Sequence, residues 1–243
     1  MKRMHFEQFY VQPQDISSNR FILKNEEARH AVKVMRKNIG DYISAADGNG
    51  RVVSGCITHL QNDKVTVSLE QSKFNIGEPG IFLTLAQGVP KGSHFDWVVE
   101  KGTEIGVSAF QPILTERCII DPAGRLERWR SKAFAAMKQS GRSRCPEILA
   151  PCSLEQFLNS RQDEQVFIAH ESETARISNE QQYTLDRKAC ALMIGPEGGF
   201  TEKEYTISTD KGAIPISLGP RRLRSETAAL VGIVQILSLH NEI

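Results

Sequence analysis

Two glycine-containing loops near the C-terminus constrain the fold of this chain most. Residues 194–201 read Ile-Gly-Pro-Glu-Gly-Gly-Phe-Thr, and residues 218–228 read Leu-Gly-Pro-Arg-Arg-Leu-Arg-Ser-Glu-Thr-Ala. Each loop follows an apolar, strand-like run and leads into a helical pattern, and glycine allows sharp bends and close approach of a ligand. Open α/β sheets bind ligands at the C-terminal ends of their strands. Together the two loops therefore favour a binding site over two ordinary connections.

The bulk properties indicate a globular protein of one large or two smaller domains. The chain has 243 residues, and its hydrophobic (40%) and charged (24%) fractions are those of ordinary globular proteins. No apolar run approaches the length needed to span a bilayer, and the N-terminus lacks the apolar core of a secretory signal. The five cysteines form no Cys-x-x-Cys pair, which predicts free thiols and no zinc site. We therefore expect a cytoplasmic protein without a membrane partner.

The N-terminal part of the chain is predicted to be a small β domain. Apolar runs predict strands over residues 6–11, 21–23, 41–46, 51–60 and 64–69. The sequence Asp47-Gly-Asn-Gly50 predicts a hairpin turn, since the central positions of such turns favour positive φ. Residues 26–37 predict one helix, which Gly40 ends. Short strands, tight turns and one helix predict a barrel over residues 1–72.

The rest of the chain alternates strands and helices after a predicted linker over residues 71–79. We expect strands over 81–87, 109–114, 166–169, 189–194 and 214–218, and helices over 93–105, 126–140 and 227–239. Capping boxes beginning at Ser153 and Thr201 open two further helices. Continuous apolar strands are typical of parallel sheets that are covered on both faces. The pattern predicts an α/β domain over residues 73–243, whose last helix is buried or completed by a partner subunit.

The sequence lacks the common motifs of several enzyme classes. It has no P-loop, no complete dinucleotide fingerprint, no Gly-x-Ser-x-Gly and no His-Glu-x-x-His. Of its dispersed histidines, His94 and His170 lie near predicted loop ends. A site of backbone groups, Glu197 and loop arginines can read an adenine edge, a ribose hydroxyl and a phosphate or carboxylate. Such a site suits a nucleoside-containing cofactor better than a metal.

The two loop motifs closely resemble the paired signatures of the ribosomal RNA small subunit methyltransferase E family. This family belongs to the SPOUT class of S-adenosylmethionine-dependent RNA methyltransferases. Segments 87–92, 100–106, 115–118 and 139–147 also match it, and the block around residues 30–48 resembles its PUA-like RNA-binding domain. The resemblance covers essentially the whole chain in the right order. It implies a C-terminal SPOUT-type α/β domain with a trefoil knot, preceded by a small PUA-like β-barrel domain.

The resemblance also implies a reaction, a cofactor and partners. The family works as a homodimer with an active site completed across the interface. It transfers a methyl group from S-adenosylmethionine to N3 of one uridine in the small-subunit (16S) ribosomal RNA, which we expect to be recognised within the small ribosomal subunit. By position, the cofactor-binding residues are Ala169, His170, Ile194, Gly195, Glu197, Gly199, Leu218, Gly219, Leu223 and Arg224. After His170, however, residues 171–174 depart from the family pattern.

Methyl transfer to a uridine nitrogen needs a base and a group that stabilises negative charge. We assign charge stabilisation to Arg224 and the base to Glu226, with Glu104 as second candidate. The alternatives are that Glu226 only complements a helix dipole and that Arg224 only positions a phosphate. Phosphate contacts would make RNA binding dependent on salt. We assign them to Arg36, Lys91, Arg142 and Arg144.

Three other functions are compatible with parts of the sequence. The chain could be a non-catalytic RNA-binding protein that uses its glycine loops structurally. It could also be a methyltransferase of the same fold that acts on another RNA or on a ribose 2′-hydroxyl. A metabolic enzyme that binds another nucleotide would leave the arginine-rich loops and the β domain without a purpose. The net charge of +1 does not separate these readings.

Overall fold

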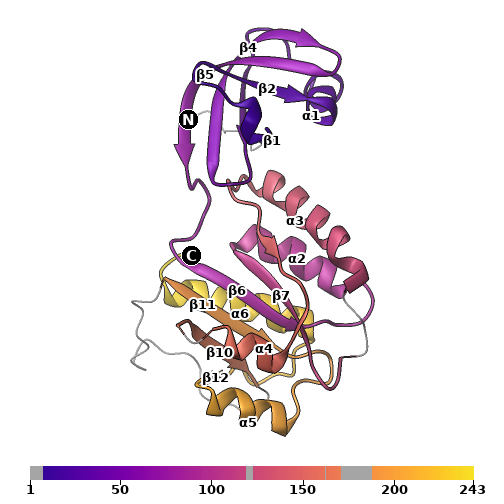
Figure 1. Ribbon diagram of the computed structural model, residues 1–243, viewed down its shortest axis with the longest axis vertical. Coiled ribbons are helices and arrows are strands. Elements are labelled where there is room, and N and C mark those ends of the chain that lie inside the picture. Colours follow the sequence, from indigo (N-terminus) through magenta and orange to yellow (C-terminus); the bar gives the residue numbers. More distant parts are fainter. Residues whose placement is uncertain (1–7, 119–122, 162, 171–187) are drawn as a thin grey trace. The chain divides into compact units, whose positions relative to one another are not determined.

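A computed structural model describes residues 8–118, 123–161, 163–170 and 188–243 (Figure 1). The chain divides into two compact units: residues 1–78 together with 134–145, and residues 79–133 together with 146–243. The expected division between residues 72 and 73 falls inside a strand. The first unit also includes a later segment of the chain, which no local sequence pattern indicated.

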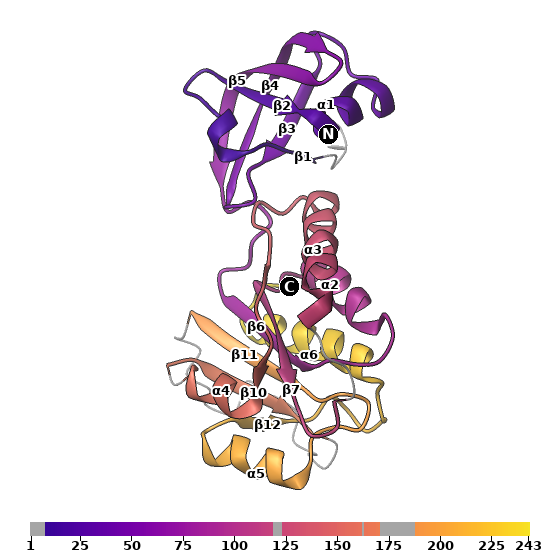
Figure 2. The same ribbon diagram turned by 45° about the vertical axis from the view of Figure 1, so that its right-hand side comes forward.

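The described part of the first unit contains a five-stranded sheet in the order β1-β3-β4-β5-β2 (Figure 2). Strands β1 and β3 run parallel, and the other neighbours are antiparallel. Alternating apolar residues such as Phe21 and Leu23, or Val65 and Val67, point to one face and form its core. The strands are β1 (Gln8–Tyr10), β2 (Arg20–Lys24), β3 (Tyr42–Ala46), β4 (Arg51–Gln61) and β5 (Lys64–Phe74).

The predicted helix and hairpin turn of this unit are present, but the helix ends in a π-helical turn and the positive φ values of the hairpin lie at other positions than expected. The helical stretch begins as α1 (Asn25–Arg29) and continues as a π-helical turn over His30–Val34. In the hairpin turn, the Asp47 side chain accepts hydrogen bonds from the backbone N–H groups of Asn49 and Arg51. Positive φ occurs at Gly48 (76°) and Gly50 (107°), not at two adjacent central residues.

The predicted linker is shorter than the sequence suggested. Strand β5 continues to Phe74, because residues 71–74 pair with β4 as far as Arg51. Polar side chains dominate this end of β5, and the exposed face of a hairpin tolerates them. The polar residues 71–73 therefore concealed the end of a strand that backbone pairing supports.

The described residues of the second unit contain a seven-stranded parallel sheet. Its order is β12-β10-β11-β6-β7-β8, and β9 also pairs with β7. The five predicted strands are confirmed within a few residues, whereas the two-residue strands β8 and β9 were not predicted. The bounds are β6 (Phe82–Gly88), β7 (Ala109–Leu114), β8 (Glu147–Ile148), β9 (Cys152–Ser153), β10 (Gln165–Ala169), β11 (Ala189–Ile194) and β12 (Ile214–Ile216).

Helices cover both faces of this parallel sheet (Figures 1 and 2). On one face Leu192 of β11 packs so tightly against Gly232 that an added Cβ there would lie 2.7 Å from its Cδ2. On the other face Met193 shares a core with Phe157 and Ile207. Successive side chains of a strand point to opposite faces. The helices are α2 (His94–Ile105), α4 (Leu154–Asn159), α5 (Glu202–Asp210) and α6 (Ser225–Leu239), and α3 spans Leu126–Ser140.

Both predicted capping boxes are present. Ser153 caps α4 with Gln156, and Thr201 caps α5 with Glu204. The buried Glu204 carboxylate also accepts a hydrogen bond of 2.8 Å from the backbone N–H of Glu116. This contact ties the end of the first glycine loop to the segment that follows β7.

One of the cysteine thiols, that of Cys190, lies buried in the core. All five cysteines are free. Burial, with a smaller effect of Glu164, raises the pKa of the Cys190 thiol to about 12, so this thiol stays protonated at neutral pH. Among the described residues, no helix is long and apolar enough to cross a membrane.

Candidate active site

The C-terminal ends of β10, β11 and β12 open into one cavity of about 630 Å³ within the second unit. Its wall contains all the residues that the sequence assigned to cofactor binding except Arg224. Residues far apart in the sequence therefore meet at the predicted edge of the sheet. The wall also includes residues that were not assigned, among them Pro196, Ser217, Pro220, Arg221, Arg222 and Ser225.

Three glycines shape this cavity for backbone reasons. A Cβ on Gly195 would lie 2.8 Å from the carbonyl carbon of Gly199, so the first loop closes on itself only without a side chain. Gly199 and Gly219 have φ values of 67° and 110°, a region that residues with a Cβ rarely adopt. The glycines expected at the site are thus required by the local conformation.

A buried serine connects the elements around the cavity. The Ser225 hydroxyl donates a 2.6 Å hydrogen bond to the carbonyl of Gly195 and accepts one of 2.8 Å from the Gln87 side chain. These bonds join the end of β6, the first glycine loop and the start of α6. Gln87 in an apolar strand and a serine at a helix start were the available sequence signals, although neither was assigned a role.

Glu197 and His170 both lie in the cavity wall and contact other parts of the protein. One Glu197 carboxylate oxygen accepts a 2.7 Å hydrogen bond from the backbone N–H of Lys91, whose side chain is exposed. The backbone N–H of His170 donates to the carbonyl of Ile216, and the centroid of the His170 ring lies 4.3 Å from that of the Tyr205 ring. Both side chains are therefore positioned by contacts that do not involve a ligand.

A second cavity of about 370 Å³ shares Glu197, Arg222, Leu223 and Ser225 with the first. Its other lining residues are His94, Arg224 and Glu226. Both predicted catalytic residues therefore lie at this cavity, together with a histidine that the sequence left without a role. The Nδ1 atom of His94 lies 3.4 Å from a carboxylate oxygen of Glu226.

The second candidate base does not lie at either cavity. Glu104 sits near the C-terminal end of α2, where its carboxylate forms a 2.8 Å ion pair with Lys101. His94 occupies the opposite end of the same helix. Glu104 is therefore not brought together with Arg224 and Glu226 at the cavity that those two residues line.

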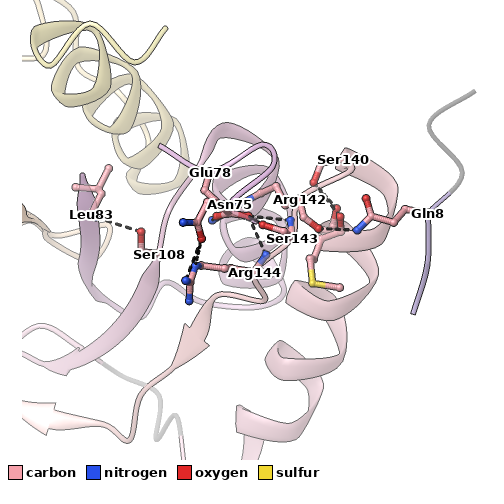
Figure 3. A network of polar contacts seen from close by, with 11 residues as sticks. Gln8, Asn75, Glu78, Leu83, Ser108, Ser140, Arg142, Ser143 and Arg144 are labelled. Carbon is pink, nitrogen blue, oxygen red and sulfur yellow. Dashed lines mark hydrogen bonds and ion pairs between the residues drawn. The ribbon is translucent and has the colours of Figure 1, made fainter. Parts of the chain in front are cut away.

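The first unit places Arg36 and Arg144 on its surface, as an RNA contact requires. Arg144 is held in place, because its Nε and one terminal nitrogen donate to the Asn75 side-chain oxygen at 3.1 and 3.0 Å (Figure 3). The neighbouring backbone N–H groups of Ser143 and Arg144 donate to the Glu78 carboxylate. This arrangement presents an ordered cation at the surface.

Arg142 differs from this expectation. Its side chain is only 3% exposed, and its Nε and a terminal nitrogen donate to one Glu78 oxygen at 3.2 and 2.7 Å (Figure 3). A buried guanidinium that is neutralised by a carboxylate cannot reach a phosphate without breaking a costly pair. The structure therefore argues against the predicted RNA contact and gives Arg142 a structural role.

The described residues contain no group of three or more histidines, cysteines, aspartates or glutamates that could hold a metal ion. The side chains that line the two cavities include the His94–Glu226 pair, Glu197, His170 and several arginines.

Comparison with known proteins identifies the family. A model described as an RNA methyltransferase domain matches residues 78–237, and one described as an RNA methyltransferase PUA domain matches residues 23–70. The ribosomal RNA small subunit methyltransferase E of Bacillus subtilis is 33% identical over 227 residues, which cover 89% of each chain. This chain belongs to the ribosomal RNA small subunit methyltransferase E family.

Solved structures support the same membership. A ribosomal RNA small subunit methyltransferase E from Neisseria gonorrhoeae, bound to S-adenosyl methionine, superposes with a TM-score of 0.86. It is 29% identical, and the match covers 97% of this chain and 98% of that one. A putative methyltransferase from Legionella pneumophila in complex with the same cofactor gives a TM-score of 0.81 at 28% identity, covering 95% and 97%. The family resemblance read from the sequence is confirmed, as is an α/β methyltransferase domain preceded by a PUA domain.

Proposed function

We propose that this protein transfers the methyl group of S-adenosylmethionine to N3 of one uridine in the small-subunit (16S) ribosomal RNA. The observation that carries the proposal is the cavity at the ends of β10, β11 and β12, which both family loop motifs line. Membership of the family supports methyl transfer to ribosomal RNA. The choice of the uridine nitrogen rests on the resemblance of the two motifs.

The larger cavity fits a nucleoside-containing methyl donor. Its volume of about 630 Å³ lies within the range of about 300–1,000 Å³ that is usual for small-molecule sites. The backbone of the glycine loops and the leucines Leu218 and Leu223 can enclose a base and a ribose. Glu197 can accept from ribose hydroxyls or stabilise a cationic group. Bound there, S-adenosylmethionine would supply an activated methyl group, and the protein would mainly position the reactants.

We assign RNA binding and methyl transfer to different parts of the chain. We assign RNA binding to a PUA-like domain over residues 1–72, with Arg36 and Arg144 on its unit's surface, and methyl transfer to residues 73–243. Lys91, exposed on the second unit, is a further candidate for a phosphate contact. Arg224 would stabilise the negative charge that develops on the uridine carbonyl oxygens.

The finer architecture and the assembly belong to the same proposal. A homodimer is supported by exposed apolar side chains on α2 and α6, where Trp97 and Val234 are 44% and 41% exposed. A trefoil knot is supported by the convergence of the loops after β10, β11 and β12 on one cavity. Closure of the first sheet into a barrel rests on the resemblance alone. Action on the small ribosomal subunit would place the protein in the cytoplasm.

The test is methyl transfer from labelled S-adenosylmethionine to small ribosomal subunits from cells that lack this activity. We expect one N3-methyluridine in the 16S RNA, located by nuclease digestion and mass spectrometry. Subunits from cells that carry the activity serve as the control and should accept little label. Transfer to another RNA or to a ribose would change the target, whereas no cofactor binding would favour a non-catalytic RNA-binding protein.

A further inference from the structure

We infer that His94, oriented by Glu226, is the general base that removes the proton from uridine N3. The inference rests on the proposed function and assigns the second cavity to the reacting base of the RNA. It replaces the direct role for Glu226 that the sequence suggested. The carboxylate then acts through the histidine and is a positioning residue.

The geometry pairs the two side chains at the start of two neighbouring helices. His94 is the first residue of α2, Glu226 is the second residue of α6, and these helices pack side by side. The His94 Nδ1 atom lies 3.4 Å from the Glu226 carboxylate. A carboxylate at one ring nitrogen favours the tautomer whose proton lies there, which leaves Nε2 as the proton acceptor.

Exposure distinguishes the two candidate bases. The His94 side chain is 49% exposed, whereas that of Glu226 is 13% exposed. The histidine is thus more accessible to a base that enters the cavity. Among ordinary side chains, an imidazole is also the stronger base, by about two pKa units over a carboxylate. Catalysis by a general base is most efficient when the pKa of the base lies near the operating pH.

The reaction balances with these groups. The N3 proton moves to Nε2 of His94, and the freed N3 electron pair forms a bond to the methyl carbon of the donor. The bond between that carbon and sulfur breaks, and sulfur keeps the electron pair as a neutral thioether. The positive charge that leaves sulfur reappears on the imidazolium of His94. Glu226 stays ionised and stabilises it.

Charged groups of both signs surround the histidine. Glu226, Glu197, Arg222 and Arg224 line the same cavity as His94. Just before His94, Arg125 donates a 2.5 Å hydrogen bond to the carbonyl of Gly92. The arginines suit the other half of the reaction, since they can stabilise negative charge on the uridine oxygens.

The test measures the single-turnover rate of methyl transfer to small subunits between pH 5.5 and 9.5. For the unaltered protein we expect the rate to rise as the imidazole loses its proton and then to become constant. His94→Ala should lower the rate at neutral pH by about 10²–10⁴-fold. Its residual rate should rise with hydroxide across the whole range, and added imidazole should restore part of it.

Glu226→Gln gives a second, independent readout. The glutamine keeps the size of the side chain but cannot stabilise the imidazolium that forms when His94 accepts the proton. The maximal rate should fall, while the shape of the profile remains. His59→Ala, which removes an exposed histidine of the first unit, is the matched control and should leave the profile unchanged.

The outcomes separate the inference from the proposed function. Calorimetry should show that His94→Ala still binds S-adenosylmethionine, which verifies that the larger cavity is intact; if this variant fails to fold, His94→Gln takes its place. An unchanged rate and profile in the histidine variant, with activity lost in Glu226→Gln, would overturn the inference and return the base to Glu226. Absence of transfer by the unaltered protein would instead contradict the proposed function.

Discussion

Two arginine clusters look alike in the sequence and differ in the structure. Arg142 and Arg144 follow Gly141, and the cluster at 221–224 follows Gly219. Arg142 is buried against Glu78, whereas Arg221, Arg222 and Arg224 are exposed at the two cavities. A glycine beside an arginine therefore does not decide its role. The role depends on whether a carboxylate lies opposite the guanidinium. For Arg142 this carboxylate is that of Glu78, which lies 64 positions earlier in the chain.

The largest expected difference between the two arginine clusters is in their contribution to the stability of the fold. Arg142→Ala should lower the free energy of unfolding by about 3–5 kcal/mol, because it leaves the Glu78 carboxylate buried and unpaired. Chemical denaturation followed by circular dichroism measures the change. The double variant Glu78→Gln/Arg142→Met should be less destabilised than the sum of the single variants. An unchanged free energy of unfolding in Arg142→Ala would show that Arg142 does not differ from the exposed arginines in its contribution to stability.

The second effect concerns chemistry at the exposed cluster. Arg224→Ala should lower the methyl-transfer rate by about 10²–10³-fold, the usual cost of losing a group that stabilises transition-state charge. RNA and cofactor affinities should change by only a few-fold. Single-turnover kinetics and filter binding measure the three quantities. A loss confined to RNA affinity would assign Arg224 to phosphate positioning.

The third effect tests the loop that carries the exposed arginines. Gly219 has a φ of 110°, and nothing lies within 4 Å of a Cβ added there, so an alanine suffers from the backbone conformation and not from a clash. Gly219→Ala should cost about 1–3 kcal/mol in strain, seen as weaker binding of S-adenosylmethionine or lower stability. No change in either quantity would mean that the loop relaxes without cost.

The smallest effect belongs to the exposed arginine of the first cluster. Arg144→Ala should weaken RNA binding and reduce the slope of log affinity against log salt by about 1, as expected for one lost phosphate contact. Filter binding at several salt concentrations measures the slope. Stability should change by less than about 0.5 kcal/mol, since the side chain is exposed. An unchanged slope would exclude Arg144 from the RNA interface.

The sequence predicted what local signals determine. Apolar runs located β7 and β11, capping boxes located α4 and α5, and the glycine loops located the larger cavity. It did not predict contacts between distant segments. The Glu78–Arg142 pair and the return of residues 134–145 to the first unit leave no local pattern. The pairing of His94 with Glu226 leaves no local pattern either, because the two residues belong to different helices.

The central claim is that the cavity formed by the glycine loops binds the methyl donor. Titration calorimetry with S-adenosylmethionine tests it directly on the unaltered protein and on Gly195→Ala, whose added Cβ would lie 2.8 Å from the Gly199 carbonyl carbon. Gly124→Ala, where nothing lies within 4 Å of the added Cβ, is the matched control. We predict binding by the unaltered protein and the control, and at least a tenfold loss (about 1.4 kcal/mol) in a folded Gly195→Ala variant. Equal binding by all three proteins, or none by the unaltered one, would contradict the account.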